Sequence, residues 1–204
     1  HELFLQWKTA PGAPRLFAKG GTHWNEYGAA RVVAEIARRL RAATGKDLPT
    51  VEIVGAATNR TIVGEDNDLG ELVNLWSGRP LAGPQVHPVV EVRPGAHLPD
   101  VLFVGDSFVF TLTNFMDRLG LYRKRNTYYY YNREYFWPAA PNAPLDKRQL
   151  DLLAEVRGRD AVVIEVGEYW LPRVGFGFVR DMLRAYDAWD AARAAESASV
   201  PAAP

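Results

Sequence analysis

The chain has 204 residues, enough to bury one sizeable core, and it carries 24 acidic residues against 24 Lys or Arg residues. With zero net charge it has no global field that would favour nucleic acid, which is therefore not expected as a partner. Cysteine is absent, which excludes disulfides and thiolate chemistry, and no apolar run reaches the roughly 18 residues of a membrane-spanning helix.

The amino-terminal part of the chain predicts a short strand and one amphipathic helix. Residues 15–18 follow a Pro/Gly turn and are typical of a strand, while apolar residues recur at helical spacing over 29–43. Asn25 is a suitable N-cap for this helix and Gly45 a suitable end. His23 stands just before the helix, on a turn that follows two glycines.

The middle of the chain is rich in proline and glycine. Strands are expected at 51–54 and 89–92, and a short helix at 68–76. His87 and His97 lie in this part of the chain and show no metal-ligand spacing. Both are interpreted as loop histidines, and no metal site is expected.

An apolar run at 101–104 leads into the turn Gly105-Asp106-Ser107 and an amphipathic stretch at 108–119. Short apolar runs bounded by turn residues predict a buried strand, here followed by a helix. Ligands bind at such strand ends in open α/β sheets, and free N–H groups at a helix start can hold an oxyanion. Ser107 is therefore a candidate nucleophile. The alternative is a simple turn in which Asp106 and Ser107 act as caps.

The remaining sequence alternates strands and helices. Expected elements are a strand at 127–131, a loop at 136–138 and 141–144, a helix at 146–156, a strand at 161–166, a helix at 173–195 and a tail at 197–204. The tyrosines of 128–131 are interpreted as sheet packing, with a sugar-stacking wall as the alternative. The pattern predicts an α/β fold, a largely parallel sheet flanked by helices in three layers, within a single domain over 1–196. Because the chain opens with His1, we expect the amino-terminal part of that domain to be missing.

A serine hydroxyl becomes nucleophilic only beside a base, usually a histidine that a carboxylate orients. His23 and Ser107 both stand on turns before helices and are expected to face the same crevice. This pairing predicts serine-dependent acyl transfer, which needs no metal and no other cofactor.

Several motifs occur in a fixed order along about residues 15–170. They are Thr22-His23-Trp24-Asn25, Gly28-Ala29, Asp68-Leu69, Val104-Gly105-Asp106-Ser107-Phe108, and 161–166 with Glu168. Together they resemble the alginate acetyltransferase-like SGNH hydrolase family, in which a histidine motif also precedes the serine block. The resemblance implies an SGNH-type fold and O-acetylation of a bacterial polysaccharide in the periplasm or outside the cell. It also implies a carbohydrate polymer and an acyl donor as partners, together with membrane-associated acetylation machinery.

By the same resemblance, Ser107 is the nucleophile and His23 its general base. The amide of Ser107 and the Gly105–Asp106 turn would contribute to the oxyanion hole. Trp24 would line the substrate site or act as a core lid over the histidine turn. Glu168 and Tyr169 would line a pocket, or simply form a solvated strand end.

The family's carboxylate, two residues before the histidine, falls on Gly21. Three alternatives follow: a Ser–His dyad of reduced rate, a substitute carboxylate from Asp68 or Glu26, or a catalytically silent carbohydrate-binding module. In the two catalytic alternatives, the acyl group passes either to water or to a sugar hydroxyl. If the resemblance holds, Gly21→Asp is predicted to raise turnover.

Overall fold

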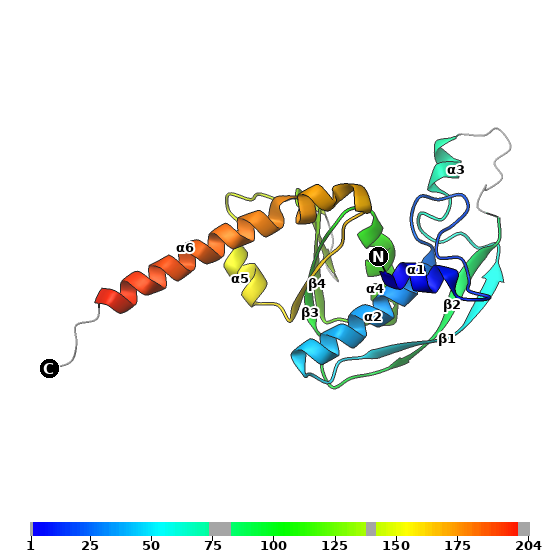
Figure 1. The fold of residues 1–204 in the computed structure, drawn as a ribbon, viewed down its shortest axis with the longest axis horizontal. Coiled ribbons are helices and arrows are strands. Elements are labelled where there is room, and N and C mark those ends of the chain that lie inside the picture. Colours follow the sequence, from blue (N-terminus) through cyan, green and yellow to red (C-terminus); the bar gives the residue numbers. More distant parts are fainter. Residues whose placement is uncertain (1, 74–82, 138–141, 200–204) are drawn as a thin grey trace. The chain divides into compact units, whose positions relative to one another are not determined.

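The computed structural model describes residues 2–73, 83–137 and 142–199 (Figure 1). The chain divides into two units: unit 1 comprises residues 1–99 and 107–123, and unit 2 comprises 100–106 and 124–204. The chain thus passes from one unit to the other between Asp106 and Ser107. The assignment of 1–196 to a single domain stays a prediction.

Two helices that pack against each other organise unit 1. Helix α2 (Glu26–Thr44) begins where Asn25 accepts a hydrogen bond from the N–H of Gly28 at 2.9 Å, and it ends at Gly45, whose φ of 65° is left-handed. Both predicted ends are confirmed. Helix α4 (Phe108–Leu119) has the predicted bounds, and its apolar face is buried as the sequence spacing requires.

Unit 1 also contains two short helices and a pair of antiparallel strands. These are α1 (Glu2–Thr9), α3 (Asp68–Leu72), β1 (Thr50–Asn59) and β2 (Gln85–Arg93). The strands include the predicted segments and extend beyond them. The helix expected at 68–76 ends at Leu72, and residues 74–76 lie outside the described part of the chain.

The strand predicted at 15–18 is wrong. Only Phe17 forms a bridge, to Trp24. The neighbouring carbonyl groups serve a different purpose, because Arg15 accepts a hydrogen bond from the Asn25 side chain and Leu16 accepts one from the Asn25 N–H. This segment therefore anchors the turn before α2 instead of joining a sheet.

A five-stranded sheet in the order β6-β5-β4-β3-β7 forms unit 2. Strand β3 (Asp100–Gly105), buried along its whole length, runs parallel to β4 (Lys124–Tyr129) and β7 (Ala161–Ile164). Strands β5 (Arg133–Trp137) and β6 (Ala143–Pro144) pair in antiparallel fashion. The α/β class is confirmed. The sheet is mixed, so a largely parallel, three-layer arrangement is not confirmed.

The mixed character of the sheet comes from a tight turn at Tyr130 and Tyr131, whose φ values of 46° and 50° are left-handed. Non-glycine residues adopt this conformation at a cost of about 1–2 kcal/mol each. It ends β4 at Tyr129 and sends the chain back into β5, so the prediction of a strand through Tyr131 is wrong. The loop predicted at 136–138 is also wrong for 136 and 137, while residue 138 lies outside the described residues.

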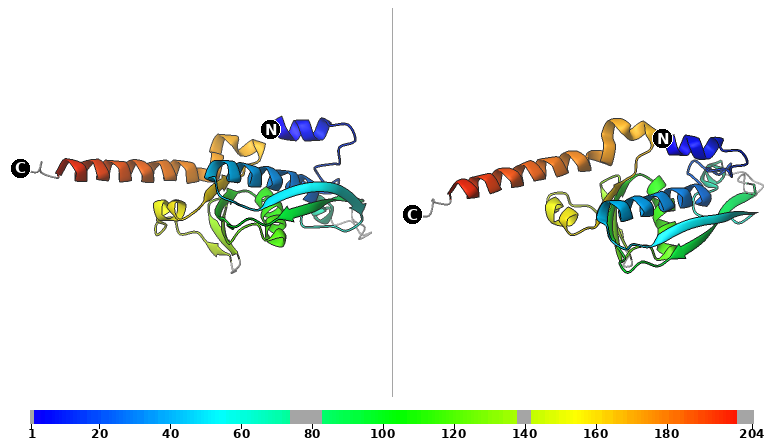
Figure 2. Two further views of the ribbon diagram at one scale, coloured as in Figure 1. Left: turned by 90° about the horizontal axis from the view of Figure 1, so that it is seen from below. Right: turned by 60° about the horizontal axis from the view of Figure 1, so that its bottom comes forward.

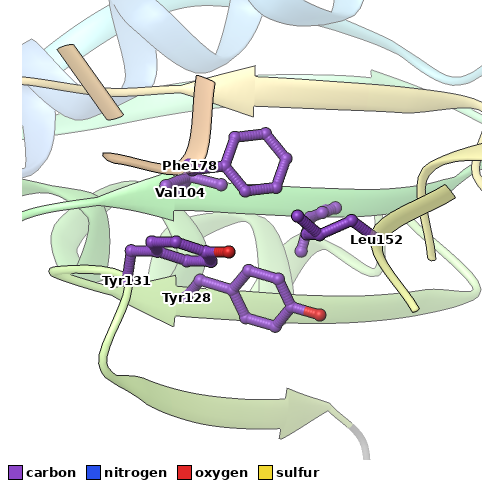
Figure 3. Close-up of a cluster of buried hydrophobic side chains, with 6 residues drawn as sticks. Val104, Tyr128, Tyr131, Leu152 and Phe178 are labelled. Carbon is purple, nitrogen blue, oxygen red and sulfur yellow. The ribbon is translucent and has the colours of Figure 1, made fainter. Parts of the chain in front are cut away.

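The core of unit 2 packs on one face of this sheet, where aromatic and aliphatic side chains from strands and helices meet (Figure 3). Its buried members are Leu102, Val104, Tyr128, Tyr131, Leu152 and Phe178. Tyr128 and Tyr131 are at most 1% exposed, which confirms the packing interpretation for these two tyrosines and excludes them from a sugar-stacking wall.

Three helices complete unit 2. They are α5 (Leu152–Arg157), the 3₁₀ segment η1 (Glu168–Gly177) and α6 (Phe178–Ser199). Figure 2 shows α6 as one continuous helix. Helix α6 starts later than predicted because the backbone is not helical at 173–176. It includes the first residues of the predicted tail, and 200–204 lie outside the described residues. Within the described ranges, no helix has the length and apolarity needed to cross a membrane.

Two acids lie side by side where β3 and β7 end, Asp106 buried and Glu165 partly buried. Asp106 is fully buried and accepts a hydrogen bond from the N–H of Gly167 at 2.9 Å, while Glu165 accepts one from the N–H of Asp106 at 3.2 Å. Burial, reinforced by the neighbouring Asp106 carboxylate, raises the pKa of Glu165 to about 9. Glu165 is therefore protonated at neutral pH, and its carboxyl group can donate to Asp106. The Asp106 carboxylate has a structural partner in the β7–η1 connection, in agreement with its interpretation as a turn residue.

Replacing Glu165 by glutamine is expected to stabilise the protein increasingly as the pH rises. The unfolded chain ionises Glu165 at its ordinary pKa, whereas the folded chain does so only near 9. The contribution of Glu165 to the free energy of unfolding of the wild type is thus complete below the ordinary pKa. It declines as the pH rises toward the folded value, by roughly 5 kcal/mol at pH 8. Glutamine is neutral in both states. Thermal unfolding should show a gap between variant and wild type that widens from pH 5 to pH 8; a constant gap would contradict this account.

Candidate active site

A chain of hydrogen bonds joins three side chains of unit 1. The Nε2 atom of His23 lies 2.8 Å from Oγ of Ser107, and its Nδ1 atom lies 2.8 Å from Oδ2 of Asp68. Because an ionised carboxylate can only accept, Nδ1 carries the proton and the Nε2 lone pair faces the serine hydroxyl. This is the arrangement of a nucleophile, a general base and an orienting acid.

Each of these side chains stands at the start of a helix. Ser107 is the N-cap residue of α4, yet its side chain makes no capping bond, which leaves Oγ free for His23. His23 stands two residues before the N-cap of α2, and Asp68 is the first residue of α3. The structure therefore brings together His23, Ser107 and Asp68 from three separate parts of the sequence.

Asp68 is held by several donors. Its carboxylate accepts hydrogen bonds from Thr22 Oγ1 at 2.6 Å, from the N–H of Thr22 at 2.8 Å and from the N–H of Leu69 at 2.7 Å, besides the bond from His23. Partial burial is the largest single influence on its pKa and acts to raise it. The bonds from Thr22, His23 and Leu69 together outweigh burial, so the pKa of Asp68 lies below its usual value. Asp68 is thus ionised and fixed in place at neutral pH.

The sequence did not predict that Thr22 binds Asp68, although Thr22 belongs to the motif Thr22-His23-Trp24-Asn25. Its hydroxyl and its backbone N–H each bind one oxygen of Asp68, so this single residue orients the carboxylate. The position of Thr22 directly before His23 was the one feature of the sequence that could have indicated this role. A small hydroxyl residue there can reach whichever acid faces the imidazole.

Glu26, the other candidate for a substitute carboxylate, does not contact His23. Its carboxylate pairs instead with Nδ1 of His87, at 2.9 Å, and with the guanidinium of Arg118. His87 lies in β2 and takes part in this buried pair, so its interpretation as a loop histidine is wrong. His97 does lie outside the helices and strands, as predicted.

Aromatic packing supports the histidine turn. The His23 ring lies over Phe108 with centroids 4.6 Å apart, and the Trp24 indole N–H donates to the carbonyl of Phe108 at 3.1 Å. Trp24 is buried and also stacks on Phe4. Its contacts are those of a core lid over the turn, the alternative to lining the substrate site.

Gly21 lies close to the backbone of Glu65 and Asp66, just before Asp68. A β-carbon on Gly21 would stand 2.6 Å from the carbonyl oxygen of Glu65 and 3.1 Å from that of Asp66. These are backbone atoms, which cannot rotate aside. Glycine at this position therefore permits the close approach through which Asp68 reaches His23, so the imidazole has a carboxylate partner although residue 21 has none.

The expectation that Gly21→Asp raises turnover is therefore reversed. The new side chain must push the histidine turn away from residues 65–68, so turnover is expected to fall at least about tenfold, with a loss of 1–3 kcal/mol of stability, on the order of other overpacked sites. Ester hydrolysis and urea unfolding of the variant test this. Gly55→Ala is the control, because a β-carbon there comes no closer than 3.7 Å to its neighbours. A Gly21→Asp variant faster than its parent would show the collision to be absent.

The remaining predicted site residues belong to unit 2. Gly105 is the last residue of β3, and Asp106 follows it. Glu168 and Tyr169 open η1 and are exposed, Tyr169 to 66%. Their role in lining a substrate site stays a prediction. Residues 2–73, 83–137 and 142–199 contain no group of three or more His, Asp or Glu side chains arranged to hold a metal ion.

Comparison with known proteins gives similarity at the level of structure. No protein-family model and no curated protein matches the chain. The O-acetyltransferase domain of Pseudomonas putida AlgJ matches with a TM-score of 0.43 and 19% identity over 83% of this chain and 59% of that one. Pseudomonas aeruginosa AlgX matches with a TM-score of 0.37 and 17% identity over 80% of this chain and 40% of that one. The chain thus spans less than two thirds of either protein.

Proposed function

We propose that this chain catalyses serine-dependent acyl transfer, with Ser107 as nucleophile, His23 as general base and Asp68 as the orienting acid. The observation that carries the proposal is the hydrogen-bonded chain from Asp68 through His23 to Ser107, with both distances at 2.8 Å. Such a constellation is recognised by its geometry and roles and recurs on unrelated folds.

In the first half of the reaction, Ser107 Oγ attacks the carbonyl carbon of an ester while Nε2 of His23 takes the hydroxyl proton. Asp68 stabilises the imidazolium that forms and keeps the ring in the tautomer that attack requires. The oxyanion of the tetrahedral intermediate is stabilised by the amide of Ser107, at the start of α4. The imidazolium then protonates the leaving alcohol, and an acyl-Ser107 ester remains.

In the second half, a hydroxyl group enters and gives its proton to Nε2 of His23 as it attacks the acyl-serine. A sugar hydroxyl makes the protein an O-acetyltransferase, and water makes it an acetylesterase. We favour transfer to a sugar of a bacterial polysaccharide, on the resemblance of the motifs. In the same proposal the fold is of the three-layer SGNH hydrolase type and the chain acts in the periplasm or outside the cell, beside a membrane-associated system that delivers the acyl group.

A catalytically silent carbohydrate-binding module is the weaker candidate. It rested on the missing acid at Gly21 and on the aromatic content near Tyr128 to Trp137. Asp68 now bonds to the histidine that would have lacked a partner, and Tyr128 and Tyr131 are buried. No other observation favours it over catalysis.

The test is to supply the purified protein with an aryl acetate and to follow phenol release with and without neutral and uronate-containing oligosaccharides. A transferase is expected to yield acetylated sugar at the expense of free acetate, with faster phenol release when the acceptor is present. An esterase yields acetate in both conditions. Phenol release no faster than in buffer would overturn the proposal, provided circular dichroism shows folded protein.

A further inference from the structure

Glu26 belongs to an ionic cluster that the proposed chemistry does not use; the side chains of Glu26 and His87 are largely buried in it, and that of Arg118 is about half exposed. Glu26 lies in the first turn of α2, and its side chain is 11% exposed. The Nδ1 atom of His87 on β2 holds the carboxylate at 2.9 Å, and the guanidinium of Arg118, in the last turn of α4, holds it from a second element. A carboxylate this buried requires such partners to keep its charge, so the three side chains depend on one another.

The turn that carries His23 and the first residue of α2 each contact α4, one near its start and the other near its end. Near the start of α4, the indole N–H of Trp24 donates to the carbonyl of Phe108. Near its end, Glu26 pairs with Arg118. Helix α4 has 12 residues and is thus about 18 Å long. Two contacts to residues near opposite ends of one stiff helix constrain its direction as well as its position along its own axis.

These contacts matter for the candidate site because Ser107 directly precedes α4. Trp24 is the residue after His23, and Glu26 lies three residues after it, at the start of a helix whose N-cap is secured by Asn25. Both contacts therefore hold α4 in position relative to the segment that carries the His23 imidazole. A slide of α4 along its axis would change the distance from Ser107 Oγ to His23 Nε2 directly.

We propose that Glu26 is a positioning residue: through Arg118 it sets the axial position of α4 and so holds the Ser107 hydroxyl within hydrogen-bonding distance of His23. The catalytic consequence rests on the proposed function, whereas the geometric one does not. His87 completes the cluster by fixing the second carboxylate oxygen.

Glu26→Gln removes the charge and keeps the shape of the side chain. It is expected to lower kcat for an aryl acetate by about 10- to 100-fold, the scale of a displacement of about 1 Å at a reacting group. KM should change little, because on this proposal the residue acts on the position of the catalytic groups and not on the binding of the ester. Burst titration of Ser107 corrects kcat for the active fraction, so a variant that is merely less stable would show a normal kcat per site.

Glu35→Gln is the matched control. Glu35 lies on the same helix and also binds two arginines, but its partners, Arg38 and Arg39, are in α2 itself. Its loss leaves α4 untouched, so kcat should stay at the wild-type value.

A second readout measures the position of α4 without activity. The chain has no cysteine, so spin labels can be attached at Ala42→Cys in α2 and Asn114→Cys in α4, both exposed positions. Pulsed electron paramagnetic resonance is expected to give one narrow distance in wild type and in Glu35→Gln, and a shifted or broadened one in Glu26→Gln. Should Glu26→Gln fail to fold, Arg118→Lys takes its place with the same expected direction.

The outcomes separate the two proposals. Active wild type with unchanged kcat and unchanged distance in Glu26→Gln overturns the positioning role and leaves acyl transfer intact. Inactive wild type with a shifted distance in Glu26→Gln overturns acyl transfer and supports the positioning role. A lowered kcat together with a shifted distance supports both.

Discussion

Replacing Ser107 by alanine is expected to remove essentially all ester hydrolysis, with turnover falling by about 10⁵ to 10⁶. No other hydroxyl group is bonded to His23 Nε2, within the described residues, so nothing can take over the attack. His23→Ala should cost nearly as much, because the hydroxyl then has no base. Stopped assays with an aryl acetate and purified variants measure both losses.

The double variant gives the sharper result. Residues that act as one unit are strongly non-additive, so Ser107→Ala with His23→Ala together should be no slower than either single variant. Additive losses would mean that the two side chains act independently and that their 2.8 Å contact has no catalytic meaning.

Replacing Asp68 by asparagine is expected to lower turnover by about 10⁴ while KM stays near its wild-type value. The asparagine amide can donate a hydrogen bond to Nδ1 of His23. The ring proton then resides on Nε2, which presents an N–H to Ser107 where a lone pair is needed. The imidazolium of the transition state also loses its counter-charge. Steady-state kinetics on the aryl acetate measure the effect.

Glu71→Gln is the control for Asp68→Asn, because Glu71 lies in the same helix α3 and is exposed. Its activity should match the wild type. An Asp68→Asn variant within tenfold of the wild type would show that the protein works as a Ser–His dyad, one of the alternatives that the sequence left open.

Local patterns in the sequence predicted the elements that carry the site. The caps at Asn25 and Gly45 and the apolar spacing of 108–119 gave α2 and α4 with nearly correct bounds, because both signals act within a few residues. The pairing of His23 with Ser107 followed from their equivalent places before helices.

Tertiary relationships were out of reach. The choice between Asp68 and Glu26 depends on which segment passes Gly21 within van der Waals distance, and no periodicity encodes that approach. The turn at Tyr130 and Tyr131 lacks the glycine or asparagine that normally marks left-handed backbone, so the hairpin into β5 was missed and the sheet was expected to be more parallel than it is.

The central claim is that Ser107 becomes acylated. The most direct measurement is an acid quench of the protein during turnover of an aryl acetate, followed by mass spectrometry of its peptides. The account predicts one acetyl group on Ser107, lost in Ser107→Ala, reduced in His23→Ala and discharged faster when an acceptor sugar is present. Turnover without acetyl on Ser107, or with acetyl equally abundant elsewhere in the Ser107→Ala variant, would contradict it.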